Sequence, residues 1–195
     1  MEEEKKLFSK KNIMGMIIVF LMVFSVLGIW QGSDNGMPDY NEFKITQKDN
    51  KYEIKTDKGT VQGYTYPGYL EGISLDTTLS AYVSLLYSPY VTILFDPADP
   101  ALAYVEVLRM ELAQTDLSPL GKSVAFAVTQ ANDTYQYPVA NCSSTAPIIY
   151  IHTTNTTTTA QIYQDENCLV LEALTWKDLI TLKDRLVYTL YGVMK

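Results

Sequence analysis

The longest hydrophobic stretch of the chain covers residues 13–30, where only Ser25 and two glycines stand among apolar side chains and no residue is charged. As an α-helix rising about 1.5 Å per residue, this stretch would be about 27 Å long, close to the thickness of the hydrocarbon core of a bilayer. A helix that is apolar on every face has no polar side to offer to water. The pattern therefore predicts a transmembrane helix over residues 13–30.

The charges beside this segment predict its orientation. The preceding tail, residues 1–12, carries four lysines, whereas residues 31–43 carry three acidic residues and neither lysine nor arginine. Because positive charge beside a span favours the cytoplasmic side, we expect the tail in the cytoplasm and the rest of the chain outside it. Residues 31–42, rich in Gly, Asp, Asn and Pro, are expected to tether one extracytoplasmic domain, residues 43–195.

Two other roles of the apolar segment compete with that of an uncleaved anchor. A cleaved signal peptide has a shorter apolar region of about 7–15 residues and a small-x-small cleavage site, which does not follow this segment. A pilin leader is processed at a basic-Gly junction and usually keeps an acidic residue in the early helix. Neither feature occurs between Lys10 and Trp30. We expect an uncleaved anchor and keep a pilin-like filament subunit as an alternative.

The domain begins with a pattern that is typical of a β-meander. Residues 43–47, 51–56 and 60–67 alternate apolar and polar side chains, and Asp, Asn and Gly stand between these segments. Alternation with a period of two, interrupted by turn residues, predicts three antiparallel strands.

The centre of the domain instead contains continuous apolar runs, at residues 91–95 and 123–128, which are typical of strands buried on both faces. Between them, Asp99 followed by Pro100 indicates the start of a helix. A strand, a helix and a second strand in this order predict parallel pairing in a right-handed crossover. We further expect a helix from Asp76 to Tyr87 and strands at residues 147–152, 160–164 and 168–173.

The last helix has the clearest signals. Thr175 and Asp178 have the spacing of a capping box, and Gly192 is placed to end the helix. Four leucines are expected to form its buried face, with Asp184 and Arg185 off that face: Leu179, Leu182, Leu186 and Leu190. Together these patterns predict a mixed α/β (α+β) domain, in which an antiparallel meander and a mixed, partly parallel sheet are packed by about three helices.

The closing segment TWKDLITLKDRLVYTLYGVM resembles the ending of uncharacterised single-pass envelope proteins of archaea. Those proteins often finish with a Thr-capped helix that carries Asp-Arg-Leu and a Gly-Val/Ile-Met tail. The resemblance covers residues 168–194 well and the rest of the chain loosely. It implies an anchored extracytoplasmic domain, and it lends no activity and no functional residue.

Charge and cysteine content narrow the possible functions. The chain beyond the tail holds 19 acidic residues against 11 lysines and arginines, which argues against nucleic acid as a partner. The two cysteines, Cys142 and Cys168, are expected to form a disulfide outside the cytoplasm, with two unpaired buried thiols as the alternative. Three Asn-x-Ser/Thr sequons also fit an exported domain and are candidate glycosylation sites: Asn132, Asn141 and Asn155.

Three residues are candidates for catalysis. Asp96 follows the apolar run at the expected carboxyl end of a parallel strand, where open sheets bind ligands, and Asp99 opens the next helix. The sequence Asp-Pro-Ala-Asp-Pro is equally what a tight turn into a capped helix requires, and we prefer that interpretation. His152, the sole histidine, could act as a general base, although a lone histidine is more often structural.

Three tyrosines, Tyr64, Tyr66 and Tyr69, could form an aromatic platform for a sugar or a partner protein. Because side chains alternate along a strand, Tyr64 and Tyr66 are expected to point to the same side. The sequence contains no P-loop, dinucleotide fingerprint, HExxH motif or EF-hand loop, so we expect no cofactor and no metal site of those kinds.

These observations favour a single-pass protein of the cell membrane, inserted in lipid through residues 13–30, that displays a non-catalytic domain outside the cytoplasm. We expect a structural or adhesive component of the envelope, or an accessory subunit of a membrane complex with a protein partner. The alternatives are a membrane-tethered hydrolase or ligand-binding domain that uses Asp96 and Asp99, and the pilin-like subunit.

Overall fold

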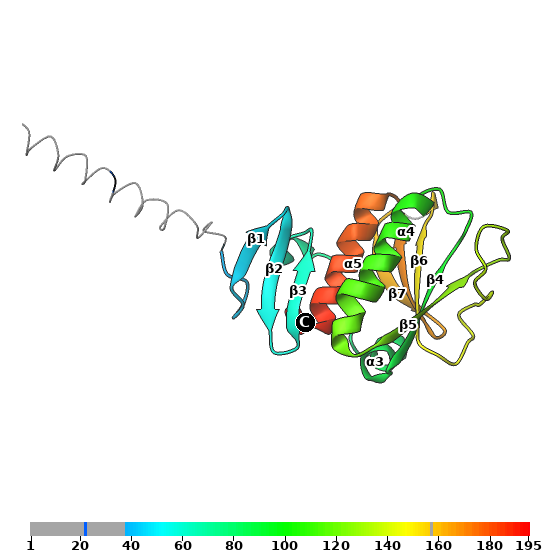
Figure 1. Ribbon diagram of the computed structural model, residues 1–195, viewed down its shortest axis with the longest axis horizontal. Helices are drawn as coiled ribbons and strands as arrows, with labels where there is room; N and C mark the ends of the chain where they lie inside the picture. The colour runs from blue at the N-terminus through cyan, green and yellow to red at the C-terminus, as the bar shows by residue number, and fades with distance from the viewer. Residues whose placement is uncertain (1–21, 23–37, 157) are drawn as a thin grey trace, which may run out of the picture. The chain divides into compact units, whose positions relative to one another are not determined.

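The computed structural model describes Met22, residues 38–156 and residues 158–195, and within residues 38–195 it shows two β-sheets and three α-helices (Figure 1). The predicted tail, the predicted span apart from Met22, and most of the predicted tether lie outside the described residues. Among the residues that are described, no helix combines the length and the apolar character needed to cross a membrane.

The smaller sheet is an antiparallel meander of β1 (Ile45–Lys48), β2 (Lys51–Thr56) and β3 (Gly59–Gly63), as the alternating pattern predicted. Asp49 and Asn50 join β1 to β2 with φ angles of 50° and 62°, as a tight two-residue hairpin turn requires. The register places three buried apolar side chains opposite one another, which gives the sheet one apolar face: Ile45, Ile54 and Val61.

The larger sheet has five strands in the order β5-β4-β6-β8-β7. Neighbouring strands are parallel, as predicted for residues 91–95 and 123–128, except that β7 runs antiparallel to β8. The strands are β4 (Tyr90–Phe95), β5 (Ser123–Val128), β6 (Ile148–Thr153), β7 (Gln161–Asp165) and β8 (Cys168–Ala173).

The helices are α3 (Ser80–Tyr87), α4 (Leu102–Glu111) and α5 (Trp176–Leu190), with a short 3-10 helix η1 (Pro67–Leu70) after β3. The last turn of α4 continues as a π-helix, η2 (Leu112–Leu117), and a 3-10 turn, η3 (Ser118–Leu120). Two helices begin later than predicted, because the carboxylates expected to cap them hold turns instead. Asp76 accepts hydrogen bonds from the backbone N–H and the hydroxyl of Thr78, and Asp99 accepts one from the N–H of Ala101.

Helix α5 lies between the two sheets and contacts β3 as well as β6 and β8 (Figure 1). Its predicted capping box is present, and Gly192 ends the helical segment with φ 80°. The prediction that Asp184 and Arg185 lie off the buried face is wrong, because their exposed fractions are 0% and 5%. A helix packed on two opposite sides has little surface left for water, so charged residues are buried with the leucines.

The contact between β3 and α5 leaves no room for a side chain at Gly63. A Cβ atom there would lie 2.3 Å from the hydroxyl oxygen of Tyr188 and 3.1 Å from the carboxyl carbon of Asp184. We expect Gly63→Ala to lower the free energy of unfolding by about 1–3 kcal/mol, as overpacking does. The test is urea unfolding of the full-length protein in detergent. Gly72→Ala is the matched control, because a Cβ at Gly72 meets no atom within 4 Å; equal effects of both substitutions would contradict the prediction.

Candidate functional site

The two faces of the five-stranded sheet are covered differently. Helices α4 and α5 pack on one face (Figure 1). The segment between β5 and β6, here called loop 129–147, is divided between the faces: its Ala140 and Cys142 pack on the other face, whereas its Tyr135 and Tyr137 pack on the helix-covered side. The loop-covered face has a small apolar core of its own: Leu94, Ala127, Ile148, Cys168 and Val170. Among the described residues, part of a loop and no helix packs against this cluster.

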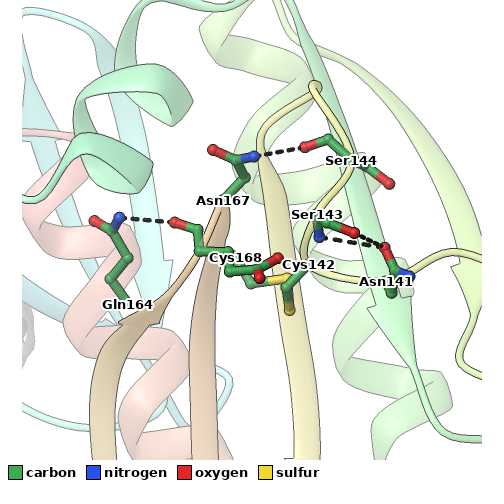
Figure 2. Close-up of a disulfide and its surroundings, with 8 residues drawn as sticks. Asn141, Cys142, Ser143, Ser144, Gln164, Asn167 and Cys168 are labelled. Carbon is green, nitrogen blue, oxygen red and sulfur yellow. Dashed lines mark hydrogen bonds between the residues drawn. A yellow bond between two sulfur atoms is a disulfide. The ribbon is translucent and has the colours of Figure 1, made fainter.

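A disulfide holds loop 129–147 against the sheet (Figure 2). It joins Cys142 to Cys168, the first residue of β8, with 5.0 Å between the Cα atoms, as the sequence predicted. Beside it, the backbone N–H of Asn167 donates to the carbonyl of Cys142 at 3.0 Å, and the Asn167 amide donates to the carbonyl of Ser144 at 2.9 Å. The entry to β6 is thereby fixed to the entry to β8.

A cavity of about 380 Å³ lies between this loop and the sheet. Leu94 and Tyr150 line the cavity on the side of the sheet, and residues 140–143 line it on the side of the loop. Asp165, the last residue of β7, and Glu166, in the turn to β8, add two carboxylates, and no lysine or arginine lines the cavity. In the register of the sheet, Leu94, Tyr150, Val170 and Tyr163 stand side by side, so an apolar and aromatic row crosses four strands.

Tyr150 is the central polar group of this face. Burial raises the pKa of its hydroxyl to about 12, and the nearby carboxylates of Asp96 and Asp99 contribute to the same shift. The phenol therefore stays protonated and neutral at physiological pH, where it can donate a hydrogen bond.

The two candidate aspartates are engaged at the carboxyl ends of the strands. Asp99 is 7% exposed and accepts three hydrogen bonds, from the N–H and the hydroxyl of Thr153, both at 2.6 Å, and from the N–H of Ala101 at 2.7 Å. It ties the end of β6 to the segment that begins α4. Asp96 is half-buried and accepts from the N–H of Ala98 at 2.9 Å and from the Gln130 amide at 3.2 Å.

His152 lies two residues beyond Tyr150 on the same face of β6, and the two rings stack with centroids 4.5 Å apart. Its Nε2 atom is 3.8 Å from Oε1 of Glu172, and the other oxygen of Glu172 accepts from the Gln161 amide at 2.7 Å. The contacts of His152 are thus with an aromatic ring and a carboxylate. A catalytic role for Asp96, Asp99 and His152 remains a prediction.

The predicted tyrosine platform is divided in two, because β3 ends at Gly63 and the alternation does not continue to Tyr66. The ring of Tyr66 meets those of Tyr40, Tyr52 and Tyr69 edge-on, with centroids 5.6–6.3 Å apart. The hydroxyl of Tyr64 instead donates to Glu111. A binding role for Tyr64, Tyr66 and Tyr69 remains a prediction, and it now concerns two separate places.

Sequence reasoning did not find a buried charged cluster around Lys183, which is 2% exposed. Its ammonium nitrogen lies 2.9 Å from Asp184, 3.6 Å from Glu111 and 3.7 Å from Asp116. The second oxygen of Asp184 accepts from the backbone N–H groups of Tyr64 and Thr65, at 2.7 and 2.8 Å. The cluster therefore links α5 to the π-helix η2 and to the chain just after β3. Three consecutive charges inside a leucine-rich helix, Lys-Asp-Arg, were the sequence signal for it.

The charges of this cluster do not balance. It holds three carboxylates but two ammonium groups, because Lys51 also lies 2.9 Å from Glu111. Burial raises the pKa of Asp116 to about 6 despite the attraction of Lys183, and the charges of Asp184 and Glu111 add to the increase. Burial opposes the charge of Lys183 as well, but Asp184 and Asp116 outweigh it and raise the pKa of the ammonium.

Comparisons of the chain with protein-family models, with curated proteins and with solved structures find no match.

The raised pKa of Asp116 predicts how stability changes with pH. Because the folded state binds this proton more tightly than the unfolded chain, whose carboxyl has its ordinary pKa of 3.8, the gain is complete below about pH 4 and is lost as the pH rises through 6. The loss corresponds to about 3 kcal/mol, at 1.36 kcal/mol per pKa unit. Asp116→Asn should therefore raise the free energy of unfolding near pH 7 and leave it nearly unchanged at pH 4.

Denaturant unfolding of both proteins between pH 4 and pH 7.5 measures this difference, with Asp133→Asn, in an exposed loop, as the control. An Asp116→Asn protein less stable than the wild type at pH 7 would mean that Lys183 needs all three charges.

Proposed function

We propose that this protein is a single-pass membrane protein that displays residues 43–195 outside the cytoplasm as a non-catalytic domain. Residues 1–12 stay in the cytoplasm, and residues 13–30 bind membrane lipid. The domain acts as a structural or adhesive component of the envelope, or as an accessory subunit that binds a protein partner of a membrane complex. The resemblance over residues 168–194 to archaeal envelope proteins supports the same class.

The observation that carries this proposal is the disulfide between Cys142 and Cys168. Such bonds persist in oxidising compartments and are rare in the cytoplasm, where thiols are kept reduced. Here the bond joins loop 129–147 to the first residue of β8, across a sequence separation of 26 residues. The three sequon asparagines, Asn132, Asn141 and Asn155, are all exposed, which agrees with an exported surface.

The hydrogen bonds of Asp99 favour a structural role over hydrolysis. A nucleophile or a general base needs an oxygen that substrate can reach. Both oxygens of Asp99 are occupied by donors from Ala101 and Thr153, and the side chain is buried. The cavity beside Tyr150 is the observation that keeps a ligand-binding role as a second candidate.

If Asp99 is a structural tie, Asp99→Ala should lower the free energy of unfolding by about 2–4 kcal/mol, because it leaves buried donors of Thr153 without a partner. Thermal unfolding of the full-length protein in detergent, followed by circular dichroism, measures the loss. Asp133→Ala, at an exposed loop position, controls for the loss of an acidic residue. Unchanged stability after Asp99→Ala would instead favour a residue kept for chemistry.

The proposed orientation predicts which positions a membrane-impermeant thiol reagent can reach. In intact cells, the reagent should label a Ser33→Cys variant at once and a Ser9→Cys variant only after permeabilisation. Cys142 and Cys168 should stay unlabelled in both until a reductant is added, because they are joined. Labelling of Ser9→Cys in intact cells, or protection of Ser33→Cys, would reverse or abolish the proposed topology.

A further inference from the structure

We propose that Asn141 carries an N-linked glycan whose first sugars pack into the cavity between loop 129–147 and the sheet. This inference rests on the proposed export of the domain. It differs from sequon matching in two ways: it singles out one of three asparagines, and it assigns the glycan a site on the protein surface. The occupant of the cavity is then part of this molecule.

The position of Asn141 is the first step of the argument. Asn141 is exposed and lines the cavity, next to the disulfide (Figure 2). Its side-chain oxygen accepts hydrogen bonds from the N–H of Ser143 at 3.2 Å and from the hydroxyl of Ser143 at 2.6 Å. Both bonds use Oδ1, so the turn holds the side chain in place without engaging Nδ2, the atom to which an N-linked sugar is attached.

The chemistry of the cavity fits a neutral sugar. Its volume of about 380 Å³ lies within the range of about 300–1,000 Å³ that is usual for small-molecule sites. Tyr150, whose ring stacks on His152 on one side, lines the cavity with an aromatic side chain that can contact the apolar C–H groups of a sugar. Asp165 and Glu166 offer carboxylate oxygens to its hydroxyl groups.

The charge of the surrounding chain further limits the chemical class of ligand that the cavity can bind. The sequence from Ser123 to Trp176, which includes four of the five strands of this sheet, contains no lysine and no arginine. An anionic ligand such as a phosphate would find no cation here to balance its charge. A neutral polyol meets no such penalty, because carboxylates and amides accept and donate hydrogen bonds to it directly.

The other two sequons are internal controls. Asn132 and Asn155 are exposed, but neither lines this cavity. The oxygen of Asn132 accepts only from the backbone N–H of Thr134, at 2.7 Å, in a turn of the same loop. A glycan at either position would extend into solvent, so its loss should leave the stability of the domain unchanged.

The attachment requires a lipid-linked sugar donor, in which the sugar is joined to a polyprenyl phosphate, and the enzyme that transfers it. A bond forms between Nδ2 of Asn141 and the anomeric carbon of the sugar. The bond from that carbon to the phosphate oxygen breaks, the polyprenyl phosphate leaves, and a base of the transferase takes one proton from Nδ2.

The experiment uses the full chain isolated from its native membranes, with mass spectrometry of its peptides to measure glycan occupancy at each sequon. Thermal unfolding is then compared between the wild type and the variants Asn141→Gln, Asn132→Gln and Asn155→Gln. We expect Asn141 to be occupied and Asn141→Gln to lower the midpoint by at least about 2–4 °C, the usual effect of about 1 kcal/mol in a protein of this size. The other two variants should unfold as the wild type does.

The same Asn141→Gln pair, made in a bacterium without N-glycosylation, separates the glycan from the hydrogen bonds of Asn141 itself. There the two proteins should unfold within about 1 °C of each other. A difference as large as in the native host would assign the effect to the side chain and overturn the proposal. If Asn141 carries a glycan but Asn141→Gln leaves the unfolding midpoint unchanged, the proposed packing of the sugars in the cavity is wrong.

Failure of this inference can be told apart from failure of the proposed function. An unmodified Asn141 in a protein whose Ser33→Cys variant is labelled from outside overturns the glycan proposal alone, whatever the state of Asn132 and Asn155. Protection of that variant, with no sequon occupied, overturns both the export and the glycan.

Discussion

The burial of charged side chains in α5 is the constraint on which the rest of the fold depends. Helix α5 lies between the two sheets and therefore buries side chains on both of its faces. Three of its consecutive residues are charged and at most 5% exposed: Lys183, Asp184 and Arg185. Each is bonded where it is buried: Arg185, for example, donates to the carbonyl groups of Ile73 and Lys195. Transferring a charged side chain out of water costs more free energy than burying a leucine side chain gains. The bonds that offset this cost therefore fix the positions of the groups that bind to α5.

The bonds of the buried charged residues also fix the position of the smaller sheet against α5. Asp184 accepts from two successive backbone N–H groups just after β3, and the hydroxyl of Tyr188 donates to the carbonyl of Thr65 at 3.0 Å. The close approach that these bonds need is possible because residue 63 is a glycine. The apolar face of the meander then completes one core with the helices, whereas an apolar contact alone would tolerate sliding.

Much of the fold could be predicted from sequence, because its signals are local. The turn at Asp49 and Asn50, the capping box of Thr175 and the apolar runs of β4 and β5 act within a few residues. The roles of Asp184, Asp116 and Tyr64 could not be predicted in this way. A period of 3.6 residues identifies one buried face of a helix, but it does not indicate a second sheet on the other side.

Some features of the candidate sites could likewise be predicted from the sequence, and others could not. The cysteine count correctly predicted the bond between Cys142 and Cys168, since two cysteines in one domain leave one pairing. The sequence also indicated Asp99 as a candidate residue. Its hydrogen bonds to Thr153, 54 positions away at the end of β6, are visible only in three dimensions. The importance of Tyr150 had no sequence signal, because it comes from its neighbours across the sheet.

The contrast between the two faces of the larger sheet is the physical reason to look for function on one of them. On the helix-covered face, α5 buries Lys183, Asp184 and Arg185, and each of these side chains is hydrogen-bonded or ion-paired. Loop 129–147 has no helical pattern. The disulfide and the hydrogen bonds of Asn167 hold its residues 142–144 beside β8, whereas its Tyr135 and Tyr137 pack on Phe95 and Phe126 at the helix-covered face. An irregular segment that packs partly on each face does not fill the space beside Tyr150 as a packed helix would, which accounts for the cavity there.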